Sequence, residues 1–199
     1  MQRLYHLLDE YDLHAGDASK AAEQAIWDTF GVNCAALTLD MSGFSRMTRR
    51  FGIVHYLALV RRMQKTTAPL VAAWRGEVVK YEADNLFAIF ASAEDAVRCA
   101  LAIQASFAAS NAITSEDRDI HVSIGIAWGR ILVVPGRDFF GDAVNVACKL
   151  GEDLAQADHT LIDDGLRQHL PPQLAGVALE PAEFSVSGLA LHAWYVTAT

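Results

Sequence analysis

The chain has 199 residues with a formal net charge of −8, and 52% of its residues are hydrophobic and 20% charged. This balance is typical of one globular domain with a sizeable core and excludes a disordered or fibrous chain. The acidity argues against sequence-independent nucleic-acid binding, which depends on Lys and Arg neutralising phosphates, and against a basic patch that binds membrane surfaces.

The first residues lack the uninterrupted apolar core of a signal peptide. No apolar run approaches the roughly 20 residues that span a bilayer. The three cysteines, Cys34, Cys99 and Cys148, stand far apart among apolar neighbours, which argues against a disulfide framework and against structural zinc. We therefore expect a soluble protein of the reducing cytoplasm with neither a membrane nor a nucleic-acid partner.

The N-terminal segment is predicted to be helical. Apolar residues recur at helical spacing from Leu4 to Phe30 and are interrupted near Gly16, which predicts one or two helices. We expect residues 1–32 to form a helical extension and residues 33–199 to form the domain proper.

The elements that follow define the fold class. In chain order they are a strand at 34–39, a helix at 46–74 interrupted at Gly52, a hairpin of strands at 78–82 and 86–90, an alanine-rich helix at 93–110, strand-like runs at 121–128 and 131–134, a helix at 142–155 and a last strand at 193–196. This order predicts an α+β fold with a ferredoxin-like βαββαβ core, a helical N-terminal extension and C-terminal additions.

Two aspartates are predicted to meet at one edge of this sheet. In the βαββαβ arrangement the first and third strands are antiparallel neighbours, so Asp40, which ends the first, lies beside Asp84 in the hairpin turn before the third. Each aspartate alone is more simply explained as a turn or hairpin cap. Together they repel unless a proton or a cation lies between them, and Mg²⁺ typically binds through one or two carboxylates plus substrate phosphates.

The loop after Asp40 supports a phosphate site. Residues 41–45 form a turn with a helix-capping residue, in which Gly43 lets the backbone approach a ligand closely and Ser45 opens a helix whose N-terminal amides can face phosphate. The pattern is weak by itself and gains weight from the second aspartate.

Three segments of the sequence, at residues 40–45 (DMSGFS), 79–84 (VKYEAD) and 138–150 (DFFGDAVNVACKL), resemble the signature segments of class III adenylyl and guanylyl cyclase catalytic domains. Residues 40–45 (DMSGFS) resemble the first metal-binding stretch, and residues 79–84 (VKYEAD) resemble the base-binding lysine followed by the second metal aspartate. Residues 138–150 (DFFGDAVNVACKL) resemble the third signature segment. The order and spacing match over roughly residues 33–169, and three motifs in order are a strong signal.

The resemblance implies a metal site and a substrate loop. Asp40 and Asp84 would hold two ions, Mg²⁺ or Mn²⁺, with help from the Met41 carbonyl. Gly43, Phe44 and Ser45 would belong to the substrate-binding loop.

The resemblance also implies the groups that read and turn over ATP. Lys80 and Asp138 would read the adenine edge, and Asn145 would position the ribose and the transition state. Lys149 stands where the family usually has an arginine that stabilises charge on the reacting phosphate. If residues 142–155 are helical, Asn145 and Lys149 share one face of that helix; a solvated helix face is the simpler interpretation of these two residues alone.

The resemblance implies a homodimer, because in this family opposite protomers supply the metal-binding and base-reading residues. A chain that carries both sets should form two equivalent shared sites. We therefore predict an adenylate cyclase of signal transduction, which converts ATP into 3′,5′-cyclic AMP and pyrophosphate.

Four departures from the family pattern keep an alternative open. Ala83 replaces a glycine, which is a mild change if φ stays negative, and Lys149 replaces the arginine. Ser187 stands where the family often has a lysine that binds the triphosphate, and residues 129–141, which form an arm across the dimer partner in the family, are fewer than usual. The alternative is a low-activity cyclase-homology domain that acts as a nucleotide-binding or regulatory module. A diguanylate cyclase lacks support, because residues 82–85 (EADN) do not form the Gly-Gly-Asp/Glu-Glu-Phe-like turn.

Overall fold

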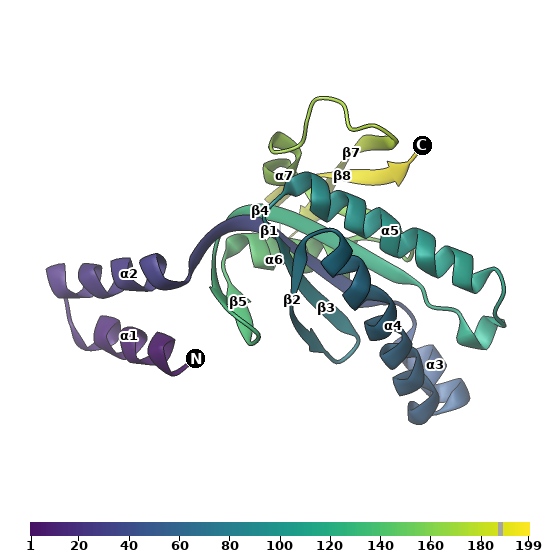
Figure 1. Cartoon of the computed structure of the whole chain (residues 1–199), viewed down its shortest axis with the longest axis horizontal. Coiled ribbons are helices and arrows are strands. Elements are labelled where there is room, and N and C mark those ends of the chain that lie inside the picture. Colours follow the sequence, from purple (N-terminus) through teal and green to yellow (C-terminus); the bar gives the residue numbers. More distant parts are fainter. Residues whose placement is uncertain (187–188) are drawn as a thin grey trace.

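A computed structural model describes residues 1–186 and 189–199 of the chain (Figure 1). Within these residues one mixed sheet of eight strands has the order β2-β3-β1-β4-β6-β8-β7, with β5 paired to β4. The strands are β1 (Gly31–Met41), β2 (Gly76–Glu82), β3 (Asn85–Phe90), β4 (Val122–Val134), β5 (Asp138–Phe140), β6 (Thr160–Asp163), β7 (Val177–Val186) and β8 (Leu189–Ala198). The four strands β2-β3-β1-β4 are antiparallel and confirm the ferredoxin-like core and the β1–β3 pairing.

Helices cover both faces of this core. They are α3 (Phe44–Phe51), α4 (Ile53–Ala73), α5 (Ala93–Asn111), α6 (Asp142–Cys148) and α7 (Asp164–Gln168), with a π-helix at Lys149–Leu154 and a 3₁₀ turn at Glu116–Arg118. The helices α4 and α5 lie side by side over one face, and α6 packs on β1 and β4. The predicted α+β fold class is confirmed.

Strand β1 separates the two cores, because alternate residues of a strand point to opposite faces. Leu37 and Leu39 are fully buried in the larger core with α4 and α5. Ala36 belongs to the smaller core with α6, and Thr38 Oγ1 lies 3.5 Å from Cys148 Sγ of that helix. Asp40 continues this second set, so its side chain leaves the strand toward the α6 face.

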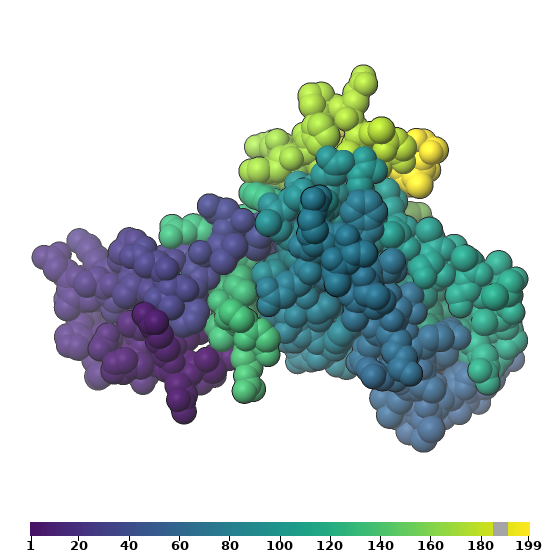
Figure 2. Space-filling view, in the orientation of Figure 1, coloured from purple at the N-terminus to yellow at the C-terminus, as the bar shows by residue number. Residues whose placement is uncertain are grey.

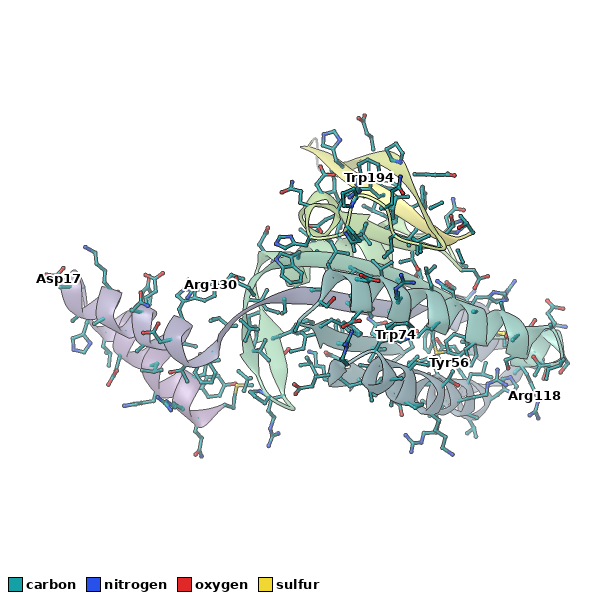
Figure 3. The ribbon with its side chains drawn as sticks, turned by 45° about the horizontal axis from the view of Figure 1, so that its top comes forward. Asp17, Tyr56, Trp74, Arg118, Arg130 and Trp194 are labelled. Carbon is teal, nitrogen blue, oxygen red and sulfur yellow. The ribbon has the colours of Figure 1, made fainter. Side chains whose placement is uncertain are left out.

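The N-terminal helices α1 (Gln2–Leu13) and α2 (Asp17–Phe30) pack against each other as a hairpin that projects from the body (Figures 1 and 2). The break near Gly16 is confirmed. A small cluster of Leu4, Ile26 and Val134 joins the hairpin to β4. At the neck between the two parts, the Arg130 guanidinium lies 4.6 Å from the centre of the Trp27 ring (Figure 3).

The helix predicted at 142–155 changes from an α-helix to a π-helix near its middle. It is α-helical to Cys148 and then π-helical, with six residues in the wide turn. The π-helix lies directly on the sheet, where Gly125 of β4 and Gly151 touch backbone to backbone; a Cβ on Gly125 would overlap the Ala147 carbonyl and the Gly151 amide. Glycine at both positions therefore permits this close approach.

Other differences lie in the turns and at the C-terminus. The predicted interruption at Gly52 is confirmed. It divides the helical segment into α3 and α4, and the segment begins two residues earlier than predicted, at Phe44. The two strand-like runs between 121 and 134 form the single strand β4, and the last strand is longer than predicted. The elements β5, β6, α7 and β7 were not predicted from the sequence. The first three have only 3, 4 and 5 residues, whereas β7 has 10 residues and pairs with β8, the next strand along the chain.

Candidate active site at the β1 edge

The two predicted metal aspartates meet at one edge of the sheet. Asp40 is the penultimate residue of β1, Asp84 lies in the turn between β2 and β3, and the pairing of Leu39 with Leu86 sets them side by side. Both line an open hollow of about 610 Å³. The remaining lining residues come from the loop after β1 and the start of α3: Met41, Ser42, Gly43, Phe44, Ser45 and Arg46.

The electrostatics of this hollow favour a cation. Burial, followed by the negative charges of Asp84 and Glu152, raises the pKa of Asp40 to about 7. Both carboxylates are partly buried, and each disfavours ionisation of the other. A bound cation would offset this repulsion, so the pair is suited to binding a positive ion. The sequence did not single out Glu152, because its approach depends on the π-helical turn.

The donor chemistry fits Mg²⁺ or Mn²⁺. Within residues 1–186 and 189–199 no group of three or more His, Cys, Asp or Glu side chains is arranged to hold a metal. Two carboxylates and a neighbouring backbone carbonyl, at Met41, therefore leave several positions to water or to substrate phosphates. This is how Mg²⁺ is commonly bound at phosphate-transfer sites.

The substrate loop begins with a left-handed residue. Gly43 has φ 95° and is the N-cap of α3, and no side chain caps the helix. The expectation that Ser45 opens the helix with a capping side chain is wrong by one residue: α3 begins at Phe44. The first turn, whose residues Phe44, Ser45 and Arg46 line the hollow, therefore has amides without a capping side chain and contains no acidic residue.

A tyrosine that sequence reasoning missed contacts the second aspartate. The Tyr56 hydroxyl, from the first turn of α4, donates a hydrogen bond of 2.7 Å to Asp84 Oδ2. Tyr56 is 2% exposed, and its ring meets the Phe44 ring edge to face at 4.9 Å. Burial, the hydrogen bond and the nearby carboxylates raise the pKa of Tyr56, so the phenol stays protonated. The only sequence signal was a tyrosine on the apolar face of a helix.

The turn that carries Asp84 is strained. Ala83 has φ 51°, so the condition under which the replacement of glycine would be mild, a negative φ, is not met. A non-glycine residue in the left-handed region costs free energy. The hairpin register of β2 and β3, which pairs Glu82 with Asn85, holds the turn in this conformation.

The predicted base-reading pair lies together, away from the hollow. Lys80 Nζ is 3.2 Å from Asp138 Oδ1 and 2.7 Å from Glu82 Oε2. The bond to Glu82 is the largest cause of a raised Lys80 pKa. The ammonium also lies 5.0 Å from the centre of the Phe87 ring, so Lys80 is charged and held in place.

Asn145 on α6 and Lys149, the first residue of the π-helix, are one helical turn apart, as predicted. The Lys149 amide bonds to the Asn145 carbonyl, which keeps the two on one side of the helix. Asn145 is exposed, while Lys149 Nζ forms a 2.6 Å ion pair with Asp153. Neither residue lines the hollow, and Ser187 lies outside the described residues.

The single chain therefore holds the predicted site residues in two groups. Asp40, Asp84 and the loop after β1 surround the hollow, whereas Lys80 pairs with Asp138 at the β2–β5 side, Asn145 belongs to α6 and Lys149 begins the π-helix that follows it. The short arm over residues 129–141 is the β4–β5 hairpin, in which Leu132 pairs with Phe140.

Comparison with known proteins gives one consistent family. The chain is 37% identical over 136 residues to "Putative adenylate cyclase 3" of Rhizobium meliloti and 31% identical over 131 residues to an adenylate cyclase of Streptomyces coelicolor. These matches cover 68% and 66% of the chain but only 23% and 32% of the relatives. The chain thus spans less than a third of the length of these curated relatives. No protein-family model matches the sequence.

The solved structures agree with the sequence relatives. An adenylate/guanylate cyclase/hydrolase from Silicibacter pomeroyi is 29% identical, has a TM-score of 0.69, and overlaps 84% of this chain and 97% of its own. The fold and the carboxylate edge define a nucleotidyl cyclase type of domain. The chain belongs to the class III adenylyl/guanylyl cyclase catalytic domain family. Among the described residues, no helix combines the length and apolar character needed to cross a bilayer.

Proposed function

We propose that this chain is the catalytic domain of an adenylate cyclase, which converts ATP into 3′,5′-cyclic AMP and pyrophosphate in two shared sites of a homodimer. The observation that carries the proposal is the convergence of Asp40 and Asp84 on one open hollow beside a glycine loop. A carboxylate pair at a strand end contributes repulsion to the folded state unless a cation is bound there.

In the proposed reaction the ribose 3′-oxygen attacks the α-phosphorus, and the bond from that phosphorus to the pyrophosphate oxygen breaks. Two Mg²⁺ or Mn²⁺ ions would be held by Asp40 and Asp84 with the Met41 carbonyl, and when bound they lower the pKa of the hydroxyl and neutralise the leaving group. The first-turn amides of α3, from Phe44 and Ser45, bind phosphate oxygens.

The ion pair of Lys80 and Asp138 is proposed to read adenine. Asp138 accepts from the N6 amino group, and Lys80 donates to N1. An ammonium has three donors, so Lys80 can keep its bond to Glu82 while it binds the base. Guanine would place its O6 acceptor against the Asp138 carboxylate, and such polar mismatches discriminate strongly.

Asn145 and Lys149 are proposed to act on the ribose and the α-phosphate. Asn145 is exposed on α6 and positions the ribose hydroxyl. Lys149 supplies positive charge to the non-bridging oxygens, after it releases Asp153. The two groups of site residues lie apart in one chain, which supports a site completed by a second copy that presents Lys80, Asp138 and α6 to the partner's hollow.

One observation favours a second candidate, a nucleotide-binding regulatory module with little turnover. The Lys149 ammonium is already neutralised by Asp153 at 2.6 Å, and a lysine lacks the rigid fork with which an arginine meets two phosphate oxygens. The carboxylate pair argues for the enzyme, because binding a nucleotide base requires no such pair.

Product analysis separates the two candidates. Purified protein is incubated with ATP or with GTP, each with Mg²⁺ or Mn²⁺, and the nucleotides are separated by chromatography. The enzyme forms cyclic AMP and pyrophosphate in equal amounts from ATP, and the Asp40→Ala variant forms neither. Nucleotide binding with no cyclic product in any of the four mixtures refutes the cyclase and supports the module.

A further inference from the structure

Tyr56 connects three parts of the candidate site. It belongs to α4, its ring packs at 4.9 Å against Phe44 of the substrate loop, and its hydroxyl donates to Asp84 Oδ2 at 2.7 Å. These contacts hold the phenol at its ring and at its hydroxyl (Figure 3). The ring is buried in the larger core, and the hydroxyl reaches the turn between β2 and β3.

The Asp84 side chain needs such support. It follows Ala83, whose φ of 51° is unfavourable for a residue with a side chain, and it stands in a turn that is only partly buried. A carboxylate in such a turn has two interchangeable oxygens and free rotation unless a donor fixes one of them. The Tyr56 hydroxyl engages Oδ2 and thereby distinguishes it from Oδ1.

We propose that Tyr56 is the positioning residue of the metal site: its hydroxyl holds Asp84 Oδ2, so that Oδ1 is the oxygen offered to a divalent cation. The inference rests on the proposed function, because it assumes that Asp84 is a metal ligand. Groups that hydrogen-bond a ligating carboxylate orient it, and their removal typically weakens metal binding about 10- to 100-fold.

The chain provides a matched control in Tyr81. This tyrosine lies on β2 in the same hairpin, and its hydroxyl is 2.9 Å from Thr67 Oγ1 and 3.3 Å from the Gln64 carbonyl of α4. Tyr56→Phe and Tyr81→Phe each remove one hydroxyl that joins α4 to the hairpin, and both keep the ring. Only the first hydroxyl contacts a carboxylate of the hollow.

The experiment measures Mn²⁺ binding by the full chain without nucleotide, from the electron paramagnetic resonance signal of free Mn²⁺. We expect Tyr56→Phe to raise the Mn²⁺ dissociation constant about 10- to 100-fold, Tyr81→Phe to leave it unchanged, and Asp84→Ala to remove the site. In assays with ATP, Tyr56→Phe should need more Mn²⁺ for half-maximal cyclic AMP formation and regain most of its kcat at saturating Mn²⁺.

The arms of the experiment separate the inference from the proposed function. Wild-type affinity in Tyr56→Phe together with loss in Asp84→Ala overturns the role of Tyr56 and leaves the metal site standing. Equal Mn²⁺ binding by wild type and Asp84→Ala, including no binding by either, overturns both. Equal losses in the two tyrosine variants show that the hydroxyls act only through the hairpin fold, which also overturns the inference.

Discussion

The two charged pairs of the candidate site differ in how each is compensated. Asp40 and Asp84 are like charges, and burial, followed by this repulsion, raises the pKa of Asp40 to about 7. Lys80 and Asp138 are opposite charges 3.2 Å apart, with Glu82 as a second partner of the lysine. The first pair lacks a positive charge between its members, and the second is satisfied within the chain. This difference supports our proposal that the bound cation belongs at the first pair and that the second pair recognises a neutral base.

The largest effect is expected from removing one member of the like-charged pair. Asp40→Ala or Asp84→Ala should lower kcat for cyclic AMP formation at least about a thousandfold. The reason is that bound metal ions stabilise the negative charge of such transition states by several kcal/mol. Circular dichroism and thermal unfolding of each variant check that the fold remains. A variant that keeps its turnover would refute the assignment of the metal site.

The opposite-charged pair should control the choice of base. Wild-type protein should prefer ATP to GTP, and Asp138→Ala should reduce the ratio of the two kcat/KM values roughly 10- to 100-fold, since one buried polar contact discriminates by that order. Competition assays with both nucleotides measure the ratio. A wild-type preference for GTP would show that Lys80 and Asp138 do not read the base as proposed.

Lys149 tests whether a charge that is paired in the free chain can serve the reaction. Loss of a well-placed charged donor costs about 3 kcal/mol, or about a hundredfold in rate. The Asp153 ion pair and the flexible stem reduce this, so we expect Lys149→Ala to lower kcat by roughly tenfold with little change in KM. Lys149→Arg should equal or exceed wild type.

The ion pair itself supplies the control for Lys149. Asp153→Asn keeps the shape of the side chain and releases the ammonium, so kcat should rise slightly or stay the same. If Lys149→Ala matches wild type, Lys149 is a solvated helix residue, and Arg46, which lines the hollow, is the next candidate for the charge.

The smallest effect is on stability in the absence of metal. The pKa of Asp40 in the folded chain, about 7, lies above its usual value near 3.9, so the folded state binds the proton more tightly than the unfolded state does. The contribution of Asp40 to stability is therefore greatest below pH ~4 and declines as the pH rises to about 7.

Asp40→Asn removes this dependence. Because Asp40 is only partly buried, we expect a gain on the order of 1–2 kcal/mol in unfolding free energy at pH 8, and little difference near pH 4. Urea unfolding of metal-free protein at the two pH values measures it. An equal effect at both would show that the charge of Asp40 is not what destabilises the fold.

Sequence reasoning reached the β1 edge because each of its parts is local. Asp40 ends an apolar run, Asp84 sits between two strand-like runs, and the strand order alone brings the two together. Tyr56 and Glu152 could not be found in this way. Tyr56 is a core residue by its helical spacing, and only the tertiary fold directs its hydroxyl to Asp84. Glu152 depends on a π-helical turn, which side-chain periodicity does not predict.

The same distinction explains part of the C-terminal half. Strand β6 has four residues and pairs in parallel with β4 and antiparallel with β8, both distant in sequence, so no local turn signal announces it. Strand β7 instead pairs with β8, the next strand along the chain, and this local pairing was missed. That the arm at 129–141 is shorter than is usual in the family stays a prediction, and the hairpin within it is local, with Val134 paired to Asp138 and Leu132 to Phe140.

The junction of α2 and β1 has a mechanical consequence. The helix ends at Phe30 and the strand begins at Gly31, without an intervening linker, and the strand then runs about 35 Å through the sheet to the aspartate end. Gly31 is tightly confined, because a Cβ there would overlap the Trp27 carbonyl. The joint therefore has no loop that could serve as a hinge, and we expect the orientation of the helical hairpin to be coupled to that of β1.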